Sequence, residues 1–160
     1  MEQEEKDLLL QDLCARLPYG LKVKCGNTVT KEICELVGIN AEISSVSIRD
    51  RWAKYYLENV VSIKPYLHPM SSMTDEEIKD LEKYTHHSFT YNPGDVEIRN
   101  IQYQAYDGIS FDPFVKATFN MPVSSCSCVR LIKWLNSHHF DYRGLIEKGL
   151  ALEAPEGMYN

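Results

Sequence analysis

The chain has 160 residues, enough for one ordinary domain that buries about two-thirds of its unfolded surface without a metal or a disulfide. Its formal net charge of −6 disfavours broad electrostatic binding of nucleic acid. The 44% hydrophobic and 25% charged fractions are typical of a globular protein and disfavour general disorder.

The N-terminal segment 3–16 is predicted to form a helix. Leu9 and Leu13 recur at helical spacing, acidic residues lie in the first turn, and Arg16 lies at the end, which suits the helix dipole. Pro18 is expected to stop this helix.

Residues 21–63 change to the pattern of short strands and tight turns. We expect a small antiparallel sheet or barrel here. The expected order is a strand at 21–25, a β-rich run at 28–37, a turn at 38–40, a strand with Ile43, Val46 and Ile48, a loop at 49–51 and a last strand at 52–63.

Helical and strand signals return after residue 63. Pro65 and Pro69 predict an extended connector over 64–70. Thr74 and Glu77 have the spacing of a capping box, which predicts a helix that ends near Tyr84. The remaining expectations are a β-hairpin of strands 95–104 and 109–119, a helix at 124–138 with Cys128, Leu131 and Leu135 buried, and a mostly irregular tail.

These elements predict an α+β protein, in which a small antiparallel sheet or barrel is accompanied by flanking helices, a β-hairpin, a C-terminal helix and an irregular tail. We expect a single compact domain over 1–160, with a division into 1–63 and 64–160 as the alternative. Apolar tail residues such as Leu145 and Leu150 should cover the domain's own sheet rather than enter a partner chain.

The cysteines indicate a reducing cellular compartment. There are five, an odd number, and the acidic N-terminus does not resemble a secretory leader. Cys126 and Cys128 form a single CxC without a second pair, so we predict no metal site and no cofactor. No apolar run approaches the ~20 residues that span a bilayer. We expect a soluble, cytoplasmic protein that does not contact a membrane.

A first candidate site combines cations with aromatic rings on the predicted sheet. These residue types suit phosphates and bases, although alternating lysines on a strand are also the pattern of a solvated face. The candidate nucleic-acid face consists of Lys22, Lys24, Arg49, Arg51, Trp52 and Tyr55.

A second candidate site lies where the last predicted helix ends. It is either an interaction surface or a segment that anchors the tail. The residues are Trp134, His138, His139, Phe140, Asp141, Tyr142 and Arg143. His138, His139 and Asp141 also suggest a hydrolase or transferase, but histidines at a helix end commonly cap its carbonyl groups. We therefore assign no catalytic residue.

Three blocks of sequence carry a resemblance to known sequences: Leu10 to Gly20, Lys64-Pro-Tyr-Leu-His-Pro-Met-Ser-Ser-Met-Thr-Asp-Glu-Glu77, and Trp134 to Tyr159. They resemble an uncharacterised family of short proteins encoded by gut anaerobic bacteria and by their phages or mobile elements. That resemblance implies a bacterial cytoplasm but no activity.

The leading hypothesis is a non-enzymatic accessory protein that binds another protein, since no motif for phosphate binding or nucleophilic catalysis is present. A nucleic-acid-binding module that uses residues 21–63 is the alternative. A hydrolase or transferase around His138 is the second alternative.

Overall fold

The structure is a computed structural model that describes residues 1–25, 33–85 and 125–159. It divides into two compact units. Unit 1 comprises Met1–Leu67 and Leu145–Asn160, and unit 2 comprises His68–Gly144. The hairpin expected at 95–104 and 109–119 lies outside the described residues. The expectation of a single domain stays a prediction.

Within the described residues, unit 1 contains one α-helix, two short 3₁₀ helices and six strands. They are α1 (Gln3–Arg16), η1 (Leu17–Tyr19), β1 (Lys22–Cys25), β2 (Ile33–Asn40), β3 (Ser45–Arg49), β4 (Tyr55–Asn59), η2 (Val60–Ser62), β5 (Ile63–Leu67) and β6 (Leu152–Glu153). The helix expected at 3–16 is confirmed.

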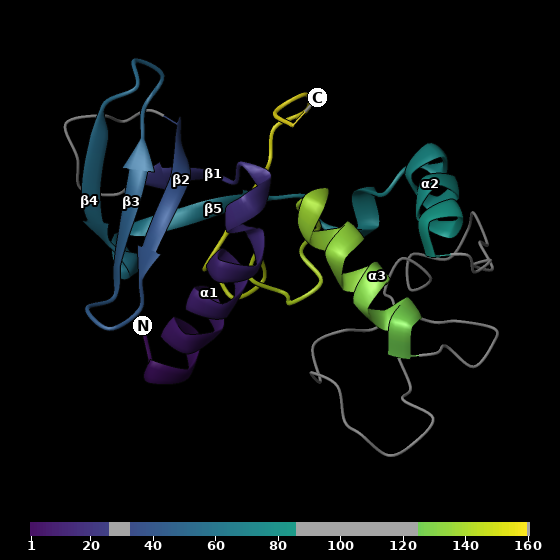
Figure 1. Cartoon of the computed structure of the whole chain (residues 1–160), viewed down its shortest axis with the longest axis horizontal. Helices are drawn as coiled ribbons and strands as arrows, with labels where there is room; N and C mark the ends of the chain where they lie inside the picture. Colours follow the sequence, from purple (N-terminus) through teal and green to yellow (C-terminus); the bar gives the residue numbers. More distant parts are fainter. Residues whose placement is uncertain (26–32, 86–124, 160) are drawn as a thin grey trace. The chain divides into compact units, whose positions relative to one another are not determined.

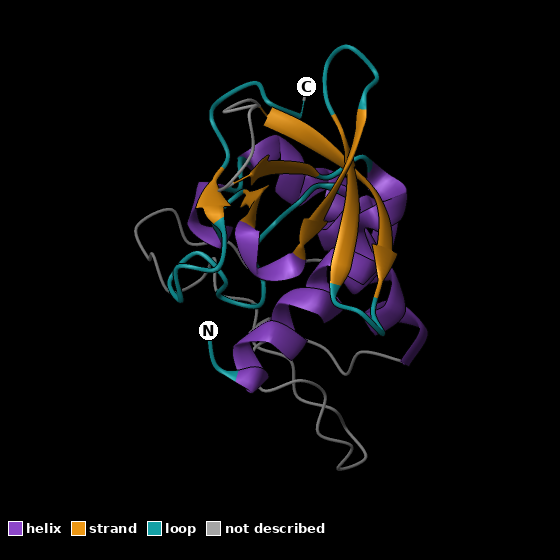
Figure 2. Cartoon of the chain, turned by 90° about the vertical axis from the view of Figure 1, so that its left-hand side faces the viewer, coloured by secondary structure: helices purple, strands orange, loops and turns teal. Residues whose placement is uncertain are grey.

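The strands form one open sheet in the order β4-β3-β2-β1-β5-β6 (Figure 1). Neighbouring strands are antiparallel, except that β6 runs parallel to β5. Figure 2 shows how strongly the strands twist. The α+β class with a small, mostly antiparallel sheet is confirmed, and the sheet does not close into a barrel.

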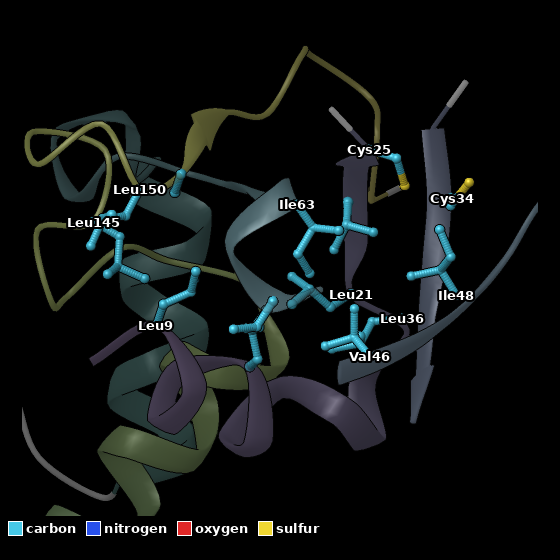
Figure 3. Close-up of a cluster of buried hydrophobic side chains, with 14 of the residues drawn as sticks. Leu9, Leu21, Cys25, Cys34, Leu36, Val46, Ile48, Ile63, Leu145 and Leu150 are labelled. Atoms are coloured by element: carbon cyan, nitrogen blue, oxygen red, sulfur yellow. The ribbon is translucent and has the colours of Figure 1, made fainter. Parts of the chain in front are cut away.

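The core of unit 1 joins the helix, the sheet and the tail (Figure 3). Leu9 and Leu13 of α1 pack with the alternate strand residues that point inward, such as Val23 and Ile48. Leu145 belongs to the same cluster and is fully buried. The tail therefore packs on its own unit, as expected.

An ion pair lies inside this apolar environment. The Nε atom of Arg16 donates a hydrogen bond to Oδ2 of Asp12 at 2.7 Å, and Nη2 donates to Oδ1 at 3.0 Å. Both side chains are fully buried. Two parallel bonds match the planar guanidinium to the carboxylate.

The turn predicted at 38–40 is wrong, because β2 continues to Asn40. Gly38 marks a shift of register against β3, which is the role of a β-bulge rather than of a chain reversal. The chain reverses after β2, in a turn over residues 41–44. This turn includes Ile43, which was expected in a strand and is 69% exposed.

The strand predicted at 52–63 is only partly correct. Only residues 55–59 of this range form a strand, β4. The chain then leaves the sheet, because the Asn59 side chain accepts a hydrogen bond from Val61 N and caps the start of η2. The expected connector at 64–70 begins as a sheet strand, β5, in which Pro65 pairs with Val23. Ile63, Pro65 and Leu67 are buried and alternate with more exposed neighbours, which is the pattern of a strand. This alternation in the sequence was not recognised.

Tyr159 fastens the tail to the sheet. Its hydroxyl accepts a hydrogen bond from Lys22 N at 3.0 Å and donates one to Tyr66 O at 2.8 Å. Because Val23 pairs with Pro65, the next pair along the ladder is Lys22 with Tyr66. The hydroxyl thus bridges the ladder at the end of the β1–β5 pairing. Burial raises the pKa of this hydroxyl to about 12 from an ordinary 10.

Tyr159→Phe should lower the free energy of unfolding by about 1–3 kcal/mol, because both backbone groups lose their partner. In the wild type, the stability that the neutral hydroxyl contributes is complete below pH 10 and is lost as the pH rises to about 12. The complete loss amounts to about 3 kcal/mol, of which about half appears by pH 11, and it should be absent from the variant. Urea unfolding between pH 8 and about 11 measures both effects.

Tyr55→Phe is the matched control for Tyr159→Phe, since Tyr55 is 66% exposed in the same unit. It should keep the alkaline loss of stability. An identical alkaline loss in the Tyr159→Phe variant would contradict the assignment.

Unit 2 contains η3 (Met70–Ser72), α2 (Asp75–Thr85) and α3 (Ser125–Ser137) among its described residues. The capping box is confirmed, since Glu77 N donates to Thr74 Oγ1 at 3.2 Å and Thr74 N donates to Glu77 Oε2 at 2.7 Å. Leu81 and Leu131 pack in a second core with residues that follow α3. Of the helices described in the two units, none has both the length and the apolar character needed to cross a bilayer.

Candidate functional site

One cross-strand row dominates the face of the sheet that points away from the unit 1 core. Lys22 pairs with Glu35, Glu35 with Arg49, and Arg49 with Tyr55, so one side chain from each of β1 to β4 lies in a line. Cross-strand neighbours of this kind interact directly. We define the outer face as this row together with Lys24, Ile33, Leu57 and the loop residues Arg51 and Trp52.

Glu35 is the electrostatic centre of the row. Its Oε2 lies 3.0 Å from Nζ of Lys22, and its Oε1 lies 2.9 Å from Nη2 of Arg49. The hydrogen bond from Lys22 is the main cause that lowers the pKa of the Glu35 carboxyl. At the other end, a hydrogen bond between Tyr55 and Arg49 is the main cause that raises the pKa of the guanidinium. The row is thus a chain of partnered polar groups.

Asp50 shapes the loop that carries the remaining candidates. Its Oδ1 accepts hydrogen bonds from the backbone N–H groups of Trp52 and Lys54, both at 2.9 Å. Its Oδ2 accepts one from the hydroxyl of Tyr56 at 3.2 Å. Burial raises the pKa of Asp50, but these hydrogen bonds outweigh it, so the net shift is downward. A short polar side chain folding the backbone in this way is typical of an Asx turn.

The loop displays a cation stacked on an aromatic ring. Cζ of Arg51 lies 3.9 Å from the centre of the Trp52 ring, which is within the range of a cation–π contact. Trp52 is 59% exposed. A surface cavity of about 380 Å³ connects this loop with the row, and it is lined by Lys22, Ile33, Cys34, Glu35, Arg49, Asp50, Arg51 and Ala53.

The structure therefore brings together the six residues of the candidate nucleic-acid face, although they come from three strands, β1, β3 and β4, and from the loop between β3 and β4. It also shows what sequence reasoning missed, which is Glu35. This carboxylate contacts both Lys22 and Arg49 and offsets part of their charge. The strand alternation placed Lys22 outward, but only the register put Glu35 between the two cations.

Most residues of the second candidate site are buried in the interior of unit 2. Trp134, His139, Phe140, Asp141 and Tyr142 are each at most 8% exposed. Burial of these five side chains removes them from an exposed interaction surface. His138 and Arg143 stay partly exposed, and the Nε atom of Arg143 donates a hydrogen bond to the hydroxyl of Tyr142.

His138 caps the end of α3. Its Nδ1 lies 3.0 Å from the carbonyl oxygen of Trp134 and 3.1 Å from Oγ of Ser137. The ring stacks on Trp134 with centroids 3.9 Å apart. The Oγ atom of Ser137 donates to the same carbonyl at 2.9 Å. The Ser137 hydroxyl and the His138 ring thus both lie at a carbonyl group of the last turn, so this geometry organises the helix end.

Asp80 ties α2 to this cluster. Its Oδ2 accepts a hydrogen bond from Nε1 of Trp134 at 2.8 Å and lies 4.0 Å from Nε2 of His138. The carboxylate nearest the His138 ring in these contacts is therefore Asp80, which the sequence did not indicate. A surface cavity of about 440 Å³ lies beside it, lined by Asp80, Lys83, Tyr84 and Arg130.

Metal-binding groups are not assembled in the described residues. No three His, Cys, Asp or Glu side chains of that part lie close enough to hold an ion. Among the described cysteines, Cys14, Cys25 and Cys34 are not in disulfide bonds. The side chains of Cys126 and Cys128 lie outside the described residues.

Comparison with known proteins found no relative: no family model, no curated protein and no solved structure matches the chain. The resemblance to proteins of gut bacteria and their mobile elements thus stays a prediction.

Proposed function

We propose that the protein acts by binding another protein through the outer face. The observation that carries this proposal is the combination of exposed aromatic and aliphatic side chains with arginines that are already held in place. Trp52, Tyr55 and Leu57 are 59%, 66% and 77% exposed. Tryptophan, tyrosine and arginine are the residue types that contribute most to protein–protein affinity.

The charges of the outer face define the chemistry of the partner. Lys22, Lys24, Arg49 and Arg51 outnumber the one carboxylate, Glu35, on a chain whose net charge is −6. A partner surface with carboxylates around an apolar centre complements this arrangement. Such a surface would place its apolar part on Trp52 and Leu57 and its carboxylates near Arg51.

Nucleic acid fits the outer face less well. Binding to a phosphate backbone needs cations that are free to exchange for counterions, and Glu35 already holds Lys22 and Arg49. Trp52 is stacked by Arg51, which competes with stacking of a base. The thiols of Cys14, Cys25 and Cys34, which are not in disulfide bonds, suit a cytoplasmic accessory role.

The test is capture from an extract of the cells that make the protein. The double variant Trp52→Ser, Tyr55→Ser should lose at least about 90% of the captured partner, because hot-spot side chains supply most of the affinity. Ile43→Ser should capture as well as the wild type, since Ile43 is 69% exposed in the same sheet but outside the outer face.

Nuclease treatment should leave the captured material in place. Capture that survives the double variant would show that the outer face is not the binding surface. Capture that nuclease abolishes, with a steep dependence on salt, would favour the nucleic-acid alternative.

A further inference from the structure

Strand β4 is an edge of the sheet with a regular set of outward backbone groups. It pairs with β3 on one side, and no described residue pairs with its other side. Lys54 O accepts from Asp50 N at 3.0 Å, and Val60 N donates to Ser44 O at 2.9 Å. Both bonds involve even-numbered residues, Lys54 and Val60. The backbone N–H and C=O groups of the even-numbered residues of β4 therefore point toward β3.

The N–H and C=O groups of Tyr55, Leu57 and Asn59 consequently point to the open edge. Such an edge is a template for another strand, and proteins usually protect it with Lys or Pro within the strand. Residues 55–59 contain neither. The same residues that present their backbone also present exposed side chains, with Leu57 the most exposed at 77%.

We propose that β4 pairs antiparallel with β4 of a second copy of this chain, about a two-fold axis at Leu57. In this register Leu57 pairs with Leu57 of the second copy, and Tyr55 pairs with Asn59. Every pair joins odd-numbered residues, whose backbone groups face the edge, so the ladder hydrogen bonds form without a bulge. Asn59 O accepts from Ser62 Oγ and, as the N-cap carbonyl of η2, also takes the first helical bond. At this pair the ladder bond therefore runs from Asn59 N–H to the Tyr55 carbonyl of the second copy.

Charge complementarity selects a second copy as the occupant. Lys54 and Glu58 lie four residues apart and so point to the same side of the strand. In the proposed register Lys54 is the diagonal neighbour of Glu58 of the second copy, within reach of its long side chain. The two-fold axis repeats this contact. Within the described part of the chain, neither residue forms an ion pair of its own.

The pairing would also enlarge the outer face. Antiparallel strands in one continuous sheet are related by an axis normal to the sheet, so both outer faces look to the same side. Leu57 and Tyr55 of the two copies then form one apolar strip. The dimer does not depend on the partner of the proposed function, and its test needs only this protein.

Sedimentation of the full chain over a range of concentrations tests the proposal. The wild type should form a dimer, and Lys54→Glu and Glu58→Lys should each weaken it about tenfold, because each turns two attractive contacts into repulsive ones. An equimolar mixture of the two variants should regain the wild-type affinity, because the heterodimer restores both contacts.

Leu57→Pro provides an independent test of the edge. It removes an N–H that points away from β3, so the sheet keeps its internal bonds while the dimer is lost. A wild type that stays monomeric at all concentrations would overturn the proposal. So would variants whose mixture associates no better than each variant alone.

Discussion

Arg16→Met should lower the free energy of unfolding by about 3–5 kcal/mol, because it leaves the fully buried Asp12 carboxylate without its guanidinium. The side chain of methionine is close enough in shape to fill much of the space. The loss is therefore mainly electrostatic rather than a loss of packing. Urea unfolding followed by circular dichroism measures the change.

Two controls separate the charge from the position. The double variant Asp12→Leu, Arg16→Met removes both charges and should recover most of the lost stability, since apolar replacements of a buried pair are often tolerated. Asp7→Asn perturbs an exposed contact of the same helix, that of Gln3 with Asp7, and should change stability by under about 0.5 kcal/mol. A double variant less stable than Arg16→Met would contradict this explanation.

Trp134→Ala should destabilise unit 2 by about 3–5 kcal/mol, the usual cost of removing a buried aromatic side chain. Trp134 is 2% exposed, stacks on Phe140 with centroids 5.7 Å apart and donates to Asp80. Loss of the ring therefore breaks the contact of α3 both with α2 and with the segment that follows. Hydrogen exchange of the amides of α2 and α3 measures this locally.

Val129→Ala is the control for Trp134→Ala, because Val129 lies in the same helix but is 66% exposed. It should leave exchange in α2 and α3 unchanged. Equal exchange in the two variants would show that Trp134 does not hold unit 2 together.

Local patterns predicted the helices better than the sheet. Residues 3–16 and the Thr74 capping box contain their signals within a few positions, and both are confirmed. The limits of β2 and β5 depend on neighbours far along the chain. Gly38 is accommodated as a bulge against β3, and Pro65 is accepted because β1 pairs with it. Because Gly38 and Pro65 were interpreted as breaks, the predicted strands ended too early.

The two candidate sites also differ in how well the sequence predicted them. Residue type and closeness along the chain were enough to gather Arg49 and Tyr55 into one candidate face, although Arg49 was expected in a loop; it ends β3, and the register pairs it with Tyr55. The C-terminal cluster had the composition of a site, but most of its aromatic and polar residues form a core. The burial of Trp134 depends on its contact with α2, in which Asp80 lies 54 positions earlier in the chain. Sequence spacing does not contain that information.

The most direct test of the central claim is photo-cross-linking from the outer face. A photoreactive phenylalanine analogue replaces Trp52 in one sample and Val129 in another, in the cells that make the protein. We expect a cross-link from position 52 to an acidic and apolar segment of a polypeptide, and none from position 129. Cross-links from position 52 to nucleic acid, or equal cross-links from both positions, would contradict it.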